Sequence, residues 1–312
     1  MKILLVDGAN NYIRNYAVVP TLTVHGEPNG GVIGFLRSLG MFVRITTPDK
    51  IVIVWDGPGG SKKRRAIVGE YKEGRKPIRL NRNFEFEVDN PEQNKVYQRV
   101  RLAEYLQDLP LFQMSIPDIE ADDTIAYLVK LFAQDEKVIV SGDKDFYQLI
   151  GDKVSVYSPT KKEFFTAEKV HTEFGVYPIN FAIARAIVGD NSDNLKGIKG
   201  IAFKKLVKMF PFMTLPEKVT LDQLFEFCVK EGEKYNRFIE GKQVIINNQK
   251  IMQLDDPIIS LASIQKIEQS LTKDVTFNAT SFRMKSYIDG VTTFNDSFFS
   301  VFRAILARKD IK

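Results

Sequence analysis

The amino-acid sequence predicts an α/β fold in which helices flank a mostly parallel central sheet. Short apolar runs predict buried strands, and the segments between them carry apolar residues at helical spacing. Parallel strands need long crossover connections, so strands that alternate with helices favour a parallel sheet. Three of the apolar runs are followed closely by an aspartate. Because sites in such sheets lie at the carboxyl ends of the strands, these aspartates are the first clue to function.

The expected elements follow from these two patterns. Strands are predicted at residues 2–6, 51–55, 111–116, 137–141 and 154–157. Helices are predicted at residues 33–43, 96–106, 125–132, 179–188 and 203–210. Strand signals fade beyond about residue 178. The sequence therefore predicts two domains, an α/β domain of residues 1–178 and a helical domain of residues 179–312.

Composition excludes several classes of protein. The chain has 312 residues, with 44 lysines and arginines against 39 acids and a net charge of +5. One cysteine excludes an internal disulfide framework and a cysteine-rich zinc site. No apolar run approaches the roughly 18 residues of a membrane span, and Asp7 comes too early for a signal peptide. We therefore expect a soluble protein of a reducing compartment.

Acidic residues gather at the ends of expected strands and the starts of expected helices. Each alone has an ordinary explanation, as a helix cap or a hydrophilic turn. Together they would meet at one edge of the sheet, where repulsion would raise their pKa values unless cations neutralised them. Oxygen-only ligation suits Mg²⁺ or Mn²⁺, and two such ions about 3.5–4 Å apart are the usual device for phosphodiester hydrolysis. The residues are Asp7, Asp56, Glu120, Asp122, Asp123, Asp143, Asp145, Asp190 and Asp193.

Six short motifs follow one another along the first two thirds of the chain. They occupy residues 5–10, 70–75, 120–123, 141–145, 189–194 and 197–202. Their order and spacing resemble the structure-specific 5′ nucleases, the family of the flap endonucleases and of the 5′-nuclease domain of bacterial DNA polymerase I. The chain has no room for a polymerase domain, so it resembles the stand-alone, phage-type members. The resemblance implies a PIN-like sheet, a helical arch at about residues 73–100, and a helix–three-turn–helix motif at about residues 179–210 in a SAM-like helical region.

The resemblance also assigns roles to the acids and to a basic pair. It implies that one metal ion is held by Asp7, Asp56, Glu120 and Asp122, and a second by Asp143, Asp145 and Asp190. Asp123 and Asp193 would be supporting ligands. Lys72 and Arg75 match the basic pair that contacts the scissile phosphate, where positive charge stabilises the pentacovalent geometry.

Further residues match the DNA contacts of the family. Tyr71 matches an aromatic on which a terminal base stacks, with ordinary packing as the alternative. A further phosphate contact falls to either Arg64 or Arg65. Lys76 and Arg79 would lie on the basic rim of the arch.

The last motif matches the part of the family that grips duplex DNA. Its glycines let backbone N–H groups approach phosphates, and its lysines add contacts that do not depend on sequence. These residues are Gly197, Lys199, Gly200, Lys204, Lys205 and Lys208. In the family, backbone carbonyls of this turn hold K⁺. Here Ala202 replaces the usual last glycine, which would cost about 1 kcal/mol if that position needed a positive φ.

The resemblance implies a Mg²⁺-dependent, two-metal 5′ nuclease, for which Mn²⁺ substitutes, that cuts 5′ flaps and acts as a 5′–3′ exonuclease. It would act as a monomer on branched or 5′-ended DNA, in primer removal or repair, in a bacterial or phage-infected cytoplasm. Two alternatives keep the chemistry: a nuclease acting on RNA–DNA hybrids, and a PIN-type ribonuclease. A third is a non-catalytic DNA-binding scaffold. Residues 189–208 argue against a small PIN ribonuclease, and the crowded acids argue against a scaffold.

Overall fold

The computed structural model describes residues 1–74, 90–257 and 259–309. Its centre is a six-stranded sheet in the order β3-β2-β1-β4-β5-β6. The first five strands pair in parallel and β6 runs antiparallel to β5. The strands are β1 (Lys2–Asp7), β2 (Lys50–Trp55), β3 (Phe112–Ser115), β4 (Glu136–Val140), β5 (Val154–Ser158) and β6 (Glu163–Phe165). The mostly parallel sheet is confirmed, and β6 is an addition too short for a sequence pattern to mark.

Helices cover both faces of the sheet because successive side chains of a buried strand point to opposite sides. In β1, Ile3 and Leu5 join one apolar core, whereas Leu4 and Val6 join the other. The first core is closed by α5 (Ala121–Leu131), α6 (Ala167–Phe174), α7 (Pro178–Val188) and α8 (Phe203–Met209). The second is closed by α1 (Gly8–Val18), α2 (Gly30–Thr46) and α4 (Pro91–Leu106).

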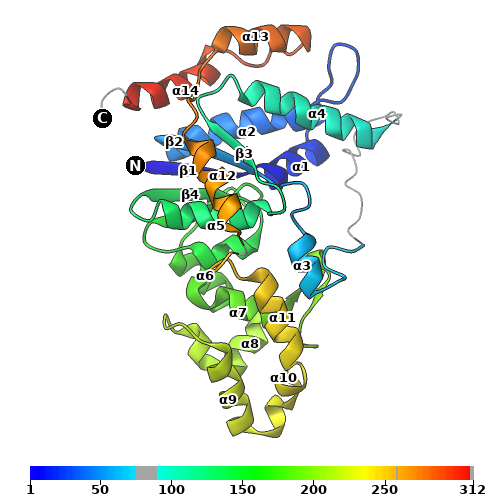
Figure 1. Ribbon diagram of the computed structural model, residues 1–312, viewed down its shortest axis with the longest axis vertical. Coiled ribbons are helices and arrows are strands. Elements are labelled where there is room, and N and C mark those ends of the chain that lie inside the picture. The colour runs from blue at the N-terminus through cyan, green and yellow to red at the C-terminus, as the bar shows by residue number, and fades with distance from the viewer. Residues whose placement is uncertain (75–89, 258, 310–312) are drawn as a thin grey trace.

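The C-terminal third of the chain contributes to both cores. Helices α9 (Leu221–Glu231), α10 (Asn236–Glu240), α11 (Lys242–Met252) and α12 (Leu261–Leu271) add side chains to the first core. Helix α14 (Asp296–Lys309) instead packs beside α2, and α13 (Ala279–Ile288) packs beside α4, at the opposite end of the molecule from α9 and α10 (Figure 1). The expected boundary near residue 178 stays a prediction. Among the described residues, no helix is long and apolar enough to cross a membrane.

The strand order brings the acidic strand ends together. Strand β1 lies between β2 and β4, with Asp7 opposite Val54 and Val6 opposite Val140. The residues that follow these three strands therefore share one edge of the sheet. Short elements complete that edge and its surroundings: α3 (Lys62–Ile67), η1 (Lys144–Leu149), β7 (Gly189–Asp190), η2 (Asn191–Asp193) and β8 (Leu195–Lys196).

Candidate active site

Two aspartates at neighbouring strand ends form the centre of the site. Asp7 caps α1, and its buried carboxylate also accepts a hydrogen bond from the Ser141 hydroxyl at 2.9 Å. Asp56 follows β2, and its Oδ1 accepts a hydrogen bond from the first amide of α5 at 2.8 Å. Burial, together with the negative charges of Asp56 and Asp143, raises the pKa of Asp7 to about 7. These carboxylates are close enough to repel one another.

A buried arginine lies among the next carboxylates. Arg64, in α3, has only 3% of its surface exposed. Its guanidinium pairs with Glu120, and with Asp122 and Asp123 at 3.1 Å each. Its Nε donates to the carbonyl oxygen of Ile251 at 2.9 Å, which joins α3 to the end of α11. This cluster therefore carries its own counter-charge.

Glu120 accepts hydrogen bonds from three side chains that all belong to residues 64–72. The Tyr71 hydroxyl, at 3.0 Å, and the Arg64 guanidinium donate to Oε2 of its carboxylate, and the Lys72 ammonium donates to Oε1 at 2.6 Å. Although burial opposes ionisation, the charges of Arg64 and Lys72 hold the pKa of Glu120 below its ordinary value. The segment that carries Lys72 is thereby fixed against the start of α5.

A second carboxylate group lies around η1 and η2. Arg185, in α7, donates from Nε to Asp145 at 2.9 Å and pairs with Asp190 through Nη2. Burial and the charge of Asp143 raise the pKa of Asp145 to about 7. Burial also raises the pKa of Asp143, as do the charges of Asp193 and Asp190. The sheet edge and the connection between α7 and α8 thus meet in one electrostatic cluster.

A cleft of about 1160 Å³ opens above these groups. It is lined by residues from four of the acidic segments, by the loop after α3, and by the α7–α8 connection. Its lining includes Asp7, Asp56, Asp122, Asp143, Lys72, Asn191, Ser192 and Asn194. The other predicted acids, Glu120, Asp123, Asp145, Asp190 and Asp193, lie in the clusters that border it. The structure therefore places four of the nine acids on the cleft wall and the other five in ion-paired clusters beside it.

The chemistry of the cleft fits divalent cations. Its acidic ligand candidates are all carboxylates, which hard cations such as Mg²⁺ prefer. Burial first, and neighbouring carboxylates second, raise the pKa values of Asp7 and Asp145, and a bound cation would favour their ionised forms. In the part of the chain that the structure describes, no three acidic, histidine or cysteine side chains lie close enough to share one ion. The guanidinium groups of Arg64 and Arg185 supply positive charge within the clusters.

Two expected DNA contacts differ from what the structure shows. Arg64 is buried in ion pairs, so of the two adjacent candidates only Arg65 is exposed for a phosphate contact. Tyr71 is 3% exposed and packs in a small apolar cluster, which fits the packing alternative and leaves no ring face for a base. Long side chains next to a motif look alike in sequence whether they face DNA or a carboxylate. Arg75, Lys76 and Arg79, with most of the expected arch, lie outside the described residues.

The segment expected to grip duplex DNA lies between α7 and α8. At Gly197 a Cβ would lie 2.1 Å from the carbonyl oxygen of Val188, so only glycine fits. Gly200 has φ +75° in open space. Ala202 has φ −118°, so alanine carries none of the cost that a positive φ would impose. The four predicted lysines, Lys199, Lys204, Lys205 and Lys208, are all exposed. Their contacts with phosphate and the K⁺ site stay predictions.

Sequence reasoning missed Arg185, which links Asp145 to Asp190. A signal for it existed, because a lone arginine in the otherwise apolar helix α7 is rarely buried without an acidic partner. Identifying that partner required the fold. The acids lie 40 positions before and 5 positions after Arg185 in the chain.

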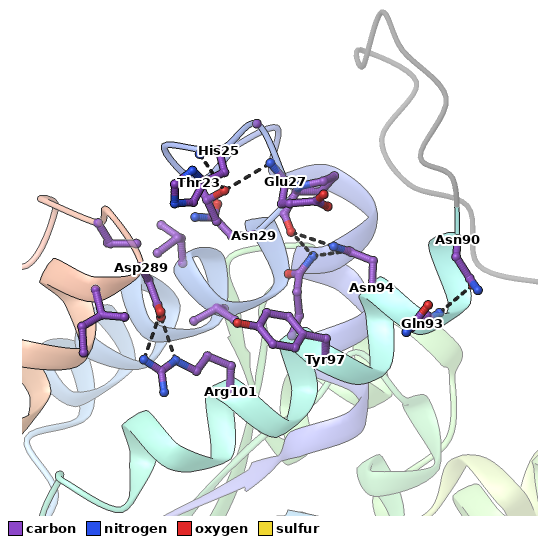
Figure 2. A pocket seen from close by; sticks show the side chains of 17 residues that line it. Thr23, His25, Glu27, Asn29, Asn90, Gln93, Asn94, Tyr97, Arg101 and Asp289 are labelled. Atoms are coloured by element: carbon purple, nitrogen blue, oxygen red, sulfur yellow. Dashed lines mark hydrogen bonds and ion pairs between the residues drawn. The ribbon is translucent and has the colours of Figure 1, made fainter.

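A second cavity, of about 700 Å³, lies apart from the carboxylates. Figure 2 shows it between residues 23–29, α4 and the segment that follows α13, where Arg101 pairs with Asp289 at 2.8 Å. Among the described residues, none of the predicted site residues lines it. The acidic cleft is therefore the candidate active site.

Comparison with known proteins agrees with the fold and with the acidic motifs. The family model described as 5′-3′ exonuclease, N-terminal resolvase-like domain, matches residues 2–175. A 5′-3′ exonuclease of Aquifex aeolicus is 34% identical over 213 residues, which cover 67% of this chain and 69% of that protein. A 5′-3′ exonuclease of Bacillus subtilis is 32% identical over 237 residues, covering 72% and 73%.

A solved structure shares the fold along nearly the whole chain. The bacteriophage T5 flap endonuclease in complex with DNA and metal ions has a TM-score of 0.63 at 18% identity, and the match covers 98% of this chain and 100% of that one. At this identity the likeness shows the fold alone. The family model and the bacterial relatives show more, and on their evidence the chain belongs to the family of 5′–3′ exonucleases with an N-terminal resolvase-like domain.

Proposed function

We propose that this chain is a divalent-metal-dependent, structure-specific 5′ nuclease that cuts DNA at 5′ flaps and degrades it from 5′ ends. The observation that carries the proposal is the cleft itself. Carboxylates from the ends of β1, β2 and β4 face Lys72 across one space, beside the α7–α8 connection. The relatives named as 5′–3′ exonucleases, and the T5 flap endonuclease bound to DNA and metal ions, support the same activity.

Two Mg²⁺ ions would be held by the carboxylates, with Mn²⁺ as a substitute. One would take Asp7, Asp56, Glu120 and Asp122, and the other Asp143, Asp145 and Asp190, with Asp123 and Asp193 in support. Bound there, such ions lower the pKa of an attacking water and neutralise charge that develops on the phosphate. Lys72 adds a fixed positive charge on the cleft wall, where it offsets the repulsion between phosphate and carboxylates.

The α7–α8 connection would hold duplex DNA beside the cleft. Exposed lysines of α8 would contact phosphates without reading sequence. A K⁺ ion on the backbone carbonyls of this turn is part of the proposal. We also propose that the protein acts as a monomer, in primer removal or repair in the cytoplasm. Cleavage of RNA paired to DNA is a further part of the proposal.

A 5′-labelled flap incubated with Mg²⁺ or with EDTA tests the function. We expect Mg²⁺ to give a product cut near the junction of single strand and duplex, together with shorter products from the 5′ end, and EDTA to give none. Matched substrates with an RNA flap strand or with RNA alone separate the ribonuclease alternatives. Binding without cleavage at any Mg²⁺ or Mn²⁺ concentration would identify a scaffold and refute the proposal.

Replacing Lys204 and Lys205 with alanine tests the duplex contact. Each phosphate contact contributes about −0.9 to the slope of log K against log salt, so the double variant should flatten that slope by roughly two. The slope is measured by fluorescence anisotropy of a labelled duplex in EDTA. Alanine at Lys266 and Lys273, exposed on and after α12, is the matched control and should leave the slope unchanged. Equal slopes for all three proteins would exclude this surface.

A further inference from the structure

Two residues beside the cleft have left-handed backbone conformations although neither is glycine. The angle φ is 59° at Lys72 and 57° at Asn194. This conformation is unfavourable for a lysine, so its surroundings must hold it in place. Asparagine tolerates it far better. Strained backbone of this kind gathers at functional sites, and here the strained lysine faces the carboxylates.

The two residues lie in segments that hold each other through a pair of hydrogen bonds. The backbone amide of Lys72 donates to the carbonyl oxygen of Asp193 at 2.9 Å. In the opposite direction, the side-chain amide of Asn194 donates to the carbonyl oxygen of Glu70 at 3.0 Å. The two bonds lie on either side of Tyr71, so residues 70–72 are held against residues 193–194.

An apolar contact supports the same junction. Tyr71 packs with Leu195, Ile251 and Met252 in a cluster separate from the two main cores. Residues 70–72 therefore contact residues 193–195 in three ways: through a backbone hydrogen bond, through the side-chain amide of Asn194, and through the ring of Tyr71. The α7–α8 connection also carries Asp190, whose carboxylate belongs to the second acidic group. The junction thus fixes the position of Lys72 relative to the carboxylate group that contains Asp190.

We infer that Asn194 is a positioning residue that holds the loop carrying Lys72 against the α7–α8 connection. The inference rests on the proposed nuclease function, in which Lys72 faces the scissile phosphate. Asparagine suits this place for two reasons. It tolerates the left-handed backbone, and its amide supplies the donor that the Glu70 carbonyl accepts. In this role Asn194, which also lines the cleft, acts through the loop that carries Lys72.

The Asn194→Gly variant separates the amide from the backbone conformation, because glycine accepts the positive φ readily and removes the side-chain donor. We expect the single-turnover rate of flap cleavage at saturating enzyme to fall about tenfold, since small misplacement of a reacting group is costly. The dissociation constant for flap DNA, measured by anisotropy in EDTA, should not change. Lys162→Gly is the matched control, because Lys162 is an exposed residue with φ 58° in the turn between β5 and β6. Its rate should equal that of the wild type.

A double-mutant cycle with Lys72→Ala decides whether Asn194 acts through the lysine. If it does, Asn194→Gly has little further effect once Lys72 is gone. Multiplicative losses in the cycle, or a wild-type rate for Asn194→Gly alone, would overturn the inference. A wild-type protein that does not cut flaps in Mg²⁺ is a different result, because it refutes the proposed function.

Discussion

The Asp143→Asn variant is expected to lose flap cleavage by about three orders of magnitude or more, because a metal-held phosphoryl oxygen is worth several kcal/mol in the transition state. Asp143 lines the cleft, and burial, together with the charges of Asp193 and Asp190, raises its pKa. Asparagine keeps the shape and removes the charge that would hold a cation. Single-turnover cleavage in Mg²⁺ measures the rate, and anisotropy in EDTA should show that duplex binding survives.

A second measurement separates loss of metal from loss of fold. Titration with Mn²⁺, followed by its electron paramagnetic resonance, should show weaker binding in the Asp143→Asn protein. Asp152→Asn is the matched control, since Asp152 is exposed in the turn before β5, away from the cleft. Full turnover by Asp143→Asn in Mg²⁺ would refute its assignment as a metal ligand.

The Lys72→Ala variant should lower the single-turnover rate by roughly a hundredfold, the usual effect of deleting one group that stabilises transition-state charge. Lys72 is the described basic residue that both lines the cleft after α3 and pairs with Glu120, at 2.6 Å. Arg64 and Tyr71 still donate to Glu120 in the variant, so that carboxylate keeps partners and the fold should persist. The rate is measured with enzyme in excess over a labelled flap.

Two comparisons sharpen this result. Lys72→Arg keeps the charge and should recover part of the rate, although the shape of the cation differs. Lys153→Ala removes a lysine at the opposite, amino-terminal edge of the sheet and should change nothing. An unchanged rate in Lys72→Ala, with Asp143→Asn inactive, would show that the carboxylates act without this lysine.

The sheet was predictable because a buried parallel strand has a simple sequence pattern. All five expected strands exist within one residue or two of their predicted bounds, since short apolar runs that alternate with helical patterns are typical of buried parallel strands. The acids were predictable for the same reason, because Asp7 and Asp56 directly follow such runs. Strand β6 has only three residues, too few to give a periodic pattern.

The partners of the arginines could not be read from sequence. Arg64 and Arg65 are neighbours of the same type, yet one is buried among carboxylates and the other is exposed. That difference depends on the position of α3 relative to α5 and α11, which is a property of the packed chain. The left-handed backbone of Lys72 is equally invisible, since lysine does not signal a positive φ.

The packing of α14 against α2 has a consequence for dissecting the protein. Phe298 lies against Gly40, and Phe299 and Phe302 are completely buried in the apolar core that also contains residues of β1 and β2. In topological terms, α8, whose lysines are proposed to bind duplex DNA, lies between two parts of the chain, α1–α2 and α13–α14, that share one core. A fragment cut after residue 210 would leave that core without its final layer. Variants that replace α9 and α10 alone would keep α14 packed against α2 and so leave this core intact.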